Sequence, residues 1–171
     1  RIQFANREAA AKKLRRTVGL AVVGLGTVGT GTVKVLVEHQ REIQRRLGCK
    51  LELKTICSLG ITQKDIAWTG HRVKLTLDWH EVVRDPEIDI IVELMGVLPV
   101  ARPLAFAAID AGKHFVTANK QLVAIHGVEL AERARAAIRM LEHLLAHAER
   151  PLTAEEVQLQ LVEQRGLAPT A

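Results

Sequence analysis

The chain has 171 residues, of which 48% are hydrophobic and 25% are charged, a balance typical of a soluble globular domain and not of a disordered chain. The formal net charge is +5, but only 3% of the residues are aromatic and none is tyrosine, so stacking platforms for bases are scarce and a nucleic-acid partner is not expected. The longest apolar stretches, residues 18–26 and 88–99, are too short to cross a bilayer, so we expect no membrane partner.

Cysteine and histidine content indicates neither a disulfide framework nor a metal site. Cys49 and Cys57 are the two cysteines, and Cys57 is expected to be a small buried apolar group. His143 and His147 are four residues apart, but the glutamate of a zinc-protease motif is misplaced, so we interpret them as surface residues and expect no metal. With no secretory signal in view, the expected compartment is the cytoplasm.

The first half of the chain predicts a helix, two strands and a further helix. Residues 1–16 have the pattern of a short amphipathic helix, whose basic cluster we interpret as a solvated face. Residues 18–23 form a near-continuous apolar run, which is typical of a strand buried on both faces of a parallel sheet. A helical pattern extends from Val28 to Leu47, and a second strand is predicted over residues 51–57.

The second half continues the alternation. Residues 58–76 are rich in turn residues and receive no element, whereas Val82 and Val83 indicate a short helix. Strands are predicted over residues 88–92 and 114–117, separated by a helix over 103–111. Strands that alternate with helices predict an α/β fold, a Rossmann-like parallel sheet flanked by helices, with a C-terminal helical appendage.

The strongest motif lies directly after the first predicted strand. Its six residues are Gly24, Leu25, Gly26, Thr27, Val28 and Gly29. Because a strand precedes it and a helix follows it, this G-x-G-x-x-G pattern predicts a dinucleotide-binding turn. Gly24 permits the tight turn, Gly26 lets the pyrophosphate approach the backbone, and Gly29 lets helix and strand pack closely. The alternative is a glycine-rich turn without a ligand.

The end of the second predicted strand bears on the choice of cofactor. A site specific for NAD usually has Asp or Glu there, to bind the ribose hydroxyls. This chain has Ser58 and Leu59 instead, and its next carboxylate is Asp65. Ser58 could donate to a 2′-phosphate, with Lys64 close by in the chain. The sequence therefore predicts NADP or NAD, with a lean towards NADP.

Two later strands also end in candidate cofactor loops, because ligands of open α/β sheets bind outside the carboxyl ends of the strands. The loop of residues 93–96 ends in Gly96, which either permits close approach of the cofactor or only makes a turn. The next such loop contains Thr117, Ala118, Asn119 and Lys120. Its hydroxyl, amide and ammonium groups could serve the nicotinamide ribose and an anionic substrate. The alternative is polar capping of the following helix.

Taken together, three segments resemble homoserine dehydrogenase, over about residues 17–137. These are Val-Gly-Leu-Gly-Thr-Val-Gly at 23–29, Val-Glu-Leu-Met-Gly at 92–96 and Gly-Lys-His-Phe-Val-Thr-Ala-Asn-Lys at 112–120. The resemblance implies reversible hydride transfer between NAD(P)H and L-aspartate 4-semialdehyde, giving L-homoserine, in the route to threonine and methionine. It implies that Lys120 lies at the active site and orients the substrate, and that the full-length protein is a homodimer. The chain departs from the family at Val97, where a second glycine is usual.

The resemblance divides the chain into a helical extension (1–16), a dinucleotide-binding domain (17–137) and a helical appendage (138–171). Residues 138–171 do not follow the family and instead resemble the start of a winged helix of the ferric uptake regulator family. The substrate domain, with its catalytic aspartate–lysine pair, is not found, so the isolated chain is expected to be inactive. A non-catalytic dinucleotide-sensing regulator with a DNA-binding appendage is the alternative function, and a different dehydrogenase on the same scaffold is a third.

Overall fold

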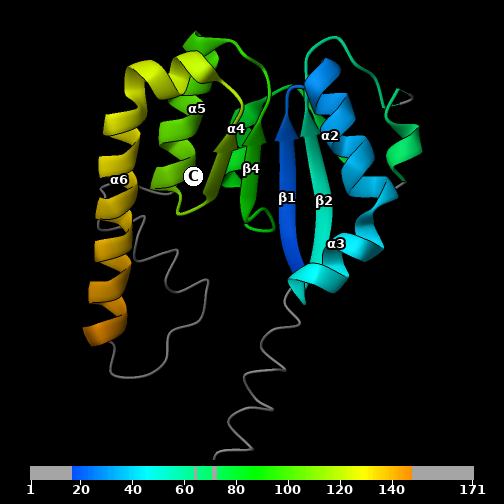
Figure 1. Ribbon diagram of the computed structural model, residues 1–171. Coiled ribbons are helices and arrows are strands. Elements are labelled where there is room, and N and C mark those ends of the chain that lie inside the picture. The colour runs from blue at the N-terminus through cyan, green and yellow to red at the C-terminus, as the bar shows by residue number, and fades with distance from the viewer. Residues whose placement is uncertain (1–16, 64, 71–72, 148–171) are drawn as a thin grey trace, which may run out of the picture.

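The computed structural model describes residues 17–63, 65–70 and 73–147 (Figure 1), so the expected helical extension at 1–16 and most of the appendage lie outside the described residues. The described part contains one five-stranded sheet in the order β3-β2-β1-β4-β5. The strands are β1 (Thr17–Val23), β2 (Lys50–Cys57), β3 (Lys74–Thr76), β4 (Ile90–Glu93) and β5 (His114–Thr117). Every pairing is parallel, which confirms the predicted Rossmann-like α/β fold.

Helices cover both faces of the sheet (Figure 1). They are α2 (Thr27–Glu38), α3 (Gln40–Leu47), the short 3₁₀ helix η1 (Ala67–Thr69), α4 (Trp79–Arg84), α5 (Leu98–Asp110) and α6 (Lys120–His147). Helix α6 packs on α5 and contributes Leu122 to a cluster with Ala101 and Ala105 of that helix. Within the described residues, no helix is both long and apolar enough to span a membrane.

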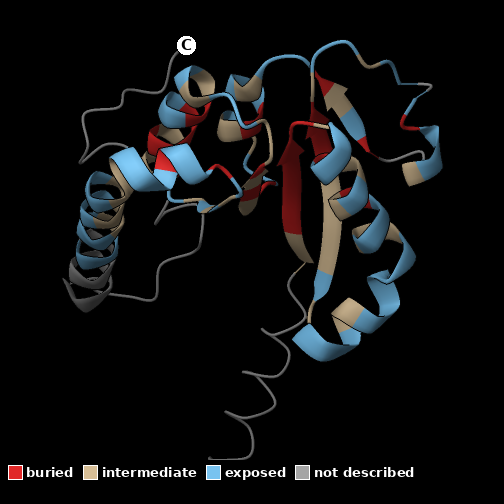
Figure 2. Ribbon diagram, turned by 45° about the horizontal axis from the view of Figure 1, so that its top comes forward, coloured by how far each residue is buried: buried red, intermediate tan, exposed pale blue. Residues whose placement is uncertain are grey.

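The central strand β1 explains why an unbroken apolar run marks this part of the sequence. Leu20 and Val22 point into a core cluster under α2, with Val33. Ala21 and Val23 point to the opposite face, into a cluster with side chains of α4 and α5. Because successive side chains of a strand alternate between faces, a strand that is covered on both sides needs apolar residues at consecutive positions. Figure 2 shows this burial along β1.

Several elements differ from the predicted ranges. The pattern over residues 28–47 forms two helices that meet at His39, and the Gln40 and Gln44 amides of the second donate to the Leu51 carbonyl oxygen at the start of β2 (3.4 and 3.0 Å). The unassigned region contains η1 and the short edge strand β3. Helix α5 begins at Leu98, before its predicted start, and α6 extends from Lys120 to His147.

Candidate functional site

The carboxyl ends of β1, β4 and β5 bring the three predicted loops to one edge of the sheet. Pairing continues past the strands: the Leu94 N–H donates to the Val23 carbonyl oxygen (2.8 Å), and the Ala118 N–H donates to the Glu93 carbonyl oxygen (3.2 Å). The strand order reverses between β1 and β4, because β2 follows on one side and β5 on the other. In doubly wound sheets, such a switch point opens a crevice that binds ligands.

Two glycines of the turn are required by packing. Gly24 has a φ of 99°, a left-handed conformation, and a Cβ there would lie 2.8 Å from the Leu94 carbonyl carbon and the Met95 nitrogen. A Cβ at Gly29 would lie 2.0 Å from the Gly24 carbonyl oxygen. These two residues therefore keep the β1–α2 turn pressed against the β4–α5 loop and against the helix that follows.

Gly26 is different, because nothing in the fold requires it to be glycine. Its φ of −75° suits any residue, and a Cβ built on it would meet nothing within 4 Å. The open space lies at the N-cap of α2, where no side chain caps the helix and the first turn holds no acidic residue. The first backbone amides of a helix have no acceptor within it, and the helix dipole makes this end positive. Gly26 thus leaves room for an anion against free amides.

Of the other residues of the turn, Leu25 packs into the core, and Thr27 and Val28 lie on the surface. Leu25 packs against the core cluster under α2, and its N–H donates to the Ser58 hydroxyl (3.3 Å). Thr27 and Val28 are exposed at the first turn of α2. Ser58 therefore touches the turn from the end of β2. Asp65, the next carboxylate along the chain, accepts hydrogen bonds from the Thr62 N–H and hydroxyl (2.8 and 2.7 Å), which also lower its pKa.

A buried carboxylate joins the other two loops. Glu93 is fully buried at the end of β4, and its Oε1 accepts hydrogen bonds from the Met95 and Gly96 amides (2.7 and 3.1 Å). Its Oε2 accepts a hydrogen bond from the Thr117 hydroxyl at 2.5 Å. Gly96 has a φ of 67°, so the turn itself requires a glycine there. Sequence reasoning did not select Glu93 as a site residue, although a carboxylate ending an apolar strand was a visible signal.

The loop after β5 caps the next helix. The Thr117 hydroxyl accepts from the Asn119 N–H (2.9 Å), and the Asn119 Oδ1 accepts from the Leu122 N–H (3.0 Å) in the first turn of α6. The capping interpretation therefore holds for Asn119. However, its side-chain Nδ2 is buried and has no hydrogen-bond partner among the described residues. An unpaired buried donor costs about 1–3 kcal/mol, so an acceptor placed against this group would stabilise the loop. Ala118 and Lys120 are exposed beside it.

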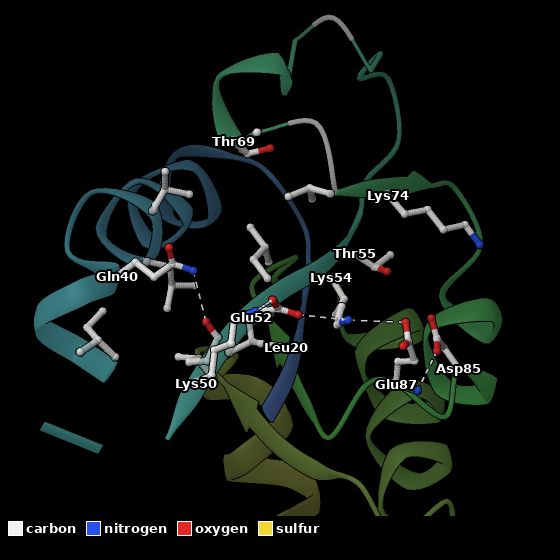
Figure 3. Close-up of a pocket in the computed structure, with 17 residues that line it drawn as sticks. Leu20, Gln40, Lys50, Glu52, Lys54, Thr55, Thr69, Lys74, Asp85 and Glu87 are labelled. Carbon is white, nitrogen blue, oxygen red and sulfur yellow. Dashed lines mark hydrogen bonds and ion pairs between the residues drawn. The ribbon is translucent and has the colours of Figure 1, made fainter. Parts of the chain in front are cut away.

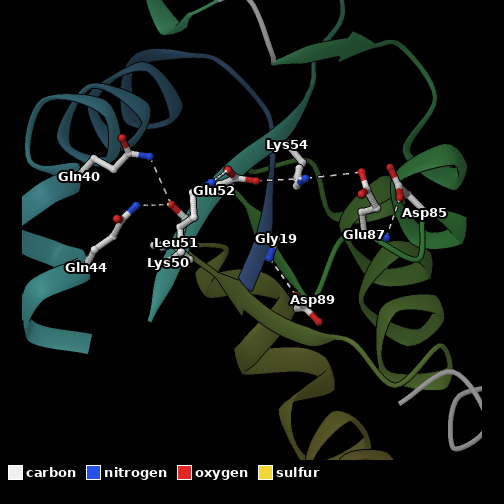
Figure 4. Close-up of polar contacts among 10 residues, drawn as sticks. All are labelled: Gly19, Gln40, Gln44, Lys50, Leu51, Glu52, Lys54, Asp85, Glu87 and Asp89. Atoms are coloured by element: carbon white, nitrogen blue, oxygen red, sulfur yellow. Dashed lines mark hydrogen bonds and ion pairs between the residues drawn. The ribbon is translucent and has the colours of Figure 1, made fainter. Parts of the chain in front are cut away.

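A separate hollow of about 700 Å³ lies towards the amino end of β2, away from the glycine turn (Figure 3). Its lysine and glutamate side chains form ion pairs: Glu52 contacts Lys50 and Lys54, and Lys54 also reaches Glu87 at 3.5 Å (Figure 4). Lys74 pairs with Glu81 outside the hollow. The hollow therefore has no role in the candidate site. Over the described ranges, no group of three or more His, Cys, Asp or Glu side chains is placed to hold a metal ion.

A parallel sheet, a glycine turn at its switch point and an uncapped helix start together define a dinucleotide-binding domain of the Rossmann class. The family model described as "Homoserine dehydrogenase, NAD binding domain" matches residues 24–151, and the chain belongs to this family. The match continues past residue 137 along α6, which runs without a break to His147.

Individual relatives agree with this assignment. The chain is 40% identical over 123 residues to the homoserine dehydrogenase of Corynebacterium glutamicum, covering 70% of this chain and 26% of that protein. It is 42% identical over 101 residues to the Pseudomonas aeruginosa enzyme, covering 59% of this chain and 23% of that protein. The crystal structure of a homoserine dehydrogenase from Thiobacillus denitrificans matches with a TM-score of 0.64 and 41% identity, covering 71% and 28% of the two chains. The chain thus spans about a quarter of the length of these relatives.

Proposed function

We propose that this chain is the cofactor-binding part of a homoserine dehydrogenase, which interconverts L-homoserine and L-aspartate 4-semialdehyde. The observation that carries the proposal is the glycine at position 26. No contact within the fold requires a glycine there, whereas an anion bound at the start of α2 would. The family assignment supports the same function. A bound NAD(P) supplies the hydride acceptor, and the residues of this chain hold it.

The proposed binding residues follow the three loops. The backbone amides of the glycine turn bind the pyrophosphate. Gly24 and Gly29 fix the shape of the turn, and Leu25 anchors the turn to the core. Thr27 and Val28 are the first two residues of α2, and their backbone amides belong to the proposed pyrophosphate site. On the nicotinamide side, the proposed residues are Gly96, Thr117, Ala118, Asn119 and Lys120. The unpaired Asn119 Nδ2 is a donor for an oxygen of the ligand, and the exposed Lys120 ammonium orients an anionic substrate.

We further propose that both NADP and NAD are accepted. The hydroxyl of Ser58 already accepts the Leu25 N–H, and its own proton remains to donate to a ribose hydroxyl or a 2′-phosphate. Asp65 accepts hydrogen bonds from Thr62 within its own turn, so it does not take the place of the carboxylate that binds the ribose hydroxyls in sites specific for NAD. This arrangement supports the lean towards NADP.

Three further parts of the proposal concern the whole protein. Family membership supports a homodimer, and the free cysteines Cys49 and Cys57 support residence in the cytoplasm. The division of the chain at residues 17 and 137 stays a prediction, since α6 crosses the second boundary. The alternative of a DNA-binding regulator depended on residues 138–171, of which 148–171 lie outside the described part, and it gains no support from the comparisons.

The test is to replace Gly26 by valine and to titrate the purified chain with NADPH and NADH, following nicotinamide fluorescence. The matched control is Gly31→Val, because Gly31 lies within α2, which Gly26 caps, and a Cβ there also meets nothing within 4 Å. We expect saturable binding by the wild type and by the control. Losing one or two charge-assisted hydrogen bonds at the pyrophosphate should weaken binding by Gly26→Val roughly ten- to hundredfold. Absence of binding by the wild type, or equal affinity of the two variants, would refute the proposal.

A further inference from the structure

The carboxylate of Glu93 is a buried charge at the edge of the sheet where the candidate site lies. Its three hydrogen-bond donors, the Met95 and Gly96 amides and the Thr117 hydroxyl, are all neutral groups. Within the described residues, no Lys, Arg or His side chain forms an ion pair with it. An ionised carboxylate is an acceptor only, and this set of donors suits that form. Its negative charge is therefore not cancelled by a neighbouring cation.

The register of the sheet places this charge at the centre of the three strand ends. Glu93 pairs with Val23 of β1, the residue before the glycine turn, and with Thr117 of β5 on its other side. The following loop touches the turn, since a Cβ on Gly24 would lie 2.8 Å from the Leu94 carbonyl carbon. Glu93 thus lies below the crevice between the turn that binds the pyrophosphate and the loop assigned to the nicotinamide side.

We propose that the buried Glu93 carboxylate, held between the β4–α5 loop and Thr117, makes the site favour the oxidised dinucleotide over the reduced one. This inference rests on the proposed function, because it needs the nicotinamide at this edge. The nicotinamide ring of the oxidised cofactor carries a positive charge, and the reduced ring is neutral. The uncancelled negative charge of Glu93 beneath the crevice attracts the positively charged ring of the oxidised cofactor and has no such attraction for the neutral ring of the reduced cofactor.

The size of the effect follows from Coulomb's law. A unit charge acting over about 10 Å at the effective dielectric constant of a partly buried site changes a binding equilibrium roughly tenfold. A purely structural role of Glu93, holding the two loops in place, would instead change the affinities for both oxidation states by the same factor. The ratio of the two dissociation constants separates these roles.

The experiment measures the dissociation constants of the reduced and oxidised dinucleotide by isothermal titration calorimetry, for the wild type and for Glu93→Gln. Glutamine keeps the shape and the acceptor for the loop amides but removes the charge. We expect the ratio of the dissociation constant of the reduced form to that of the oxidised form to fall roughly tenfold in the variant. The matched control is Thr117→Val, which removes two hydrogen bonds and no charge, and in which both constants should change alike.

A ratio in Glu93→Gln equal to that of the wild type would overturn the inference and leave the proposed function intact. Absence of dinucleotide binding by the wild type would instead overturn the proposed function, and the inference with it. If circular dichroism shows that Glu93→Gln does not fold, Glu93→Met takes its place, because methionine has a similar volume and no charge. The same fall of the ratio is then expected, and an unchanged ratio refutes the role of the charge.

Discussion

Individual residues of the glycine turn differ in what a side chain would meet, and this difference separates folding from binding. At Gly29, a Cβ would approach a backbone carbonyl oxygen, which can move only if the turn and helix α2 move apart. At Gly26 and Gly31, it would enter open space. A single methyl group at each position therefore has a different expected effect on the stability of the domain.

We expect Gly29→Ala to lower the free energy of unfolding by about 1–3 kcal/mol or more, since overpacking against backbone forces a local shift. Gly31→Ala should instead raise it by roughly 0.5–1 kcal/mol, because alanine is the better helix former. Urea unfolding followed by circular dichroism measures both. Equal stabilities of the two variants would show that the close approach at Gly29 is not maintained in solution.

Cys57 gives a second test at the scale of one side chain. Burial raises the pKa of its thiol to about 11, with smaller contributions from Asp78 and Glu81. Below that pH the folded protein holds the neutral thiol, whereas the thiolate is the reactive form. A rise of two pKa units lowers the thiolate fraction about 100-fold. At pH 8, iodoacetamide should therefore modify the half-buried Cys49 first, and Cys57 only after unfolding in urea, as read by peptide mass spectrometry. Early modification of Cys57 would contradict its burial.

At the scale of elements, sequence patterns predicted the parts of the fold that local chemistry determines. The β1 strand and its glycine turn were predicted because burial on both faces and a tight turn each require a particular run of residues. Strand β3 was not predicted, because three edge residues within a turn-rich region leave no periodic signal. The role of Asn119 was left open between a ligand and a helix cap, because the cap depends on one hydrogen bond to Leu122.

The candidate site shows the same limit. The loop residues could be predicted because they follow strands, but the part played by Glu93 depends on its contact with Thr117, 24 residues further along the chain. That contact exists because β4 and β5 pair in one particular register. A pattern that is read along the chain carries no information on which residues of two strands lie opposite each other, so the network joining the loops became visible only in the fold.

Lys113 offers a test of how the elements are held together. Its side chain is half-buried at the amino end of β5, and its Nζ donates to the Asp85 and Ile88 carbonyl oxygens, at 2.6 Å each. Burial lowers the pKa of this ammonium group, and the nearby carboxylates of Asp85 and Asp89 offset part of that effect by raising it. Lys113→Met should leave the two carbonyl groups without this donor and lower the free energy of unfolding by about 1–3 kcal/mol.

The control for this substitution is Lys34→Met, on an exposed position of α2, where a change within about 0.5 kcal/mol is expected. Urea unfolding of both variants provides the comparison. If Lys113→Met were as stable as the control, the two hydrogen bonds would contribute nothing to holding the loop between α4 and β4 against β5.

At the scale of the whole molecule, binding of the cofactor and turnover of a substrate make different demands on the chain. In the proposed function, binding uses the three loops at the carboxyl edge, and all three are formed by the described residues. Oxidation of an alcohol also needs a group that accepts its hydroxyl proton as the hydride leaves. At the described ends of β1, β4 and β5 and in the loops that follow, the ionisable side chains are those of Glu93, which is buried and fully engaged, and Lys120.

We therefore predict that the 171-residue polypeptide binds the dinucleotide without oxidising L-homoserine. The measurement pairs a binding titration with an assay for the appearance of reduced cofactor, on the same protein sample and with saturating L-homoserine. Saturable binding with no formation of reduced cofactor is the expected result, because the exposed ionisable side chain in these described loops, Lys120, is an ammonium group and therefore a hydrogen-bond donor only. Sustained turnover that is lost in Lys120→Met would instead assign proton transfer to Lys120, and would show that the cofactor edge alone assembles a working site.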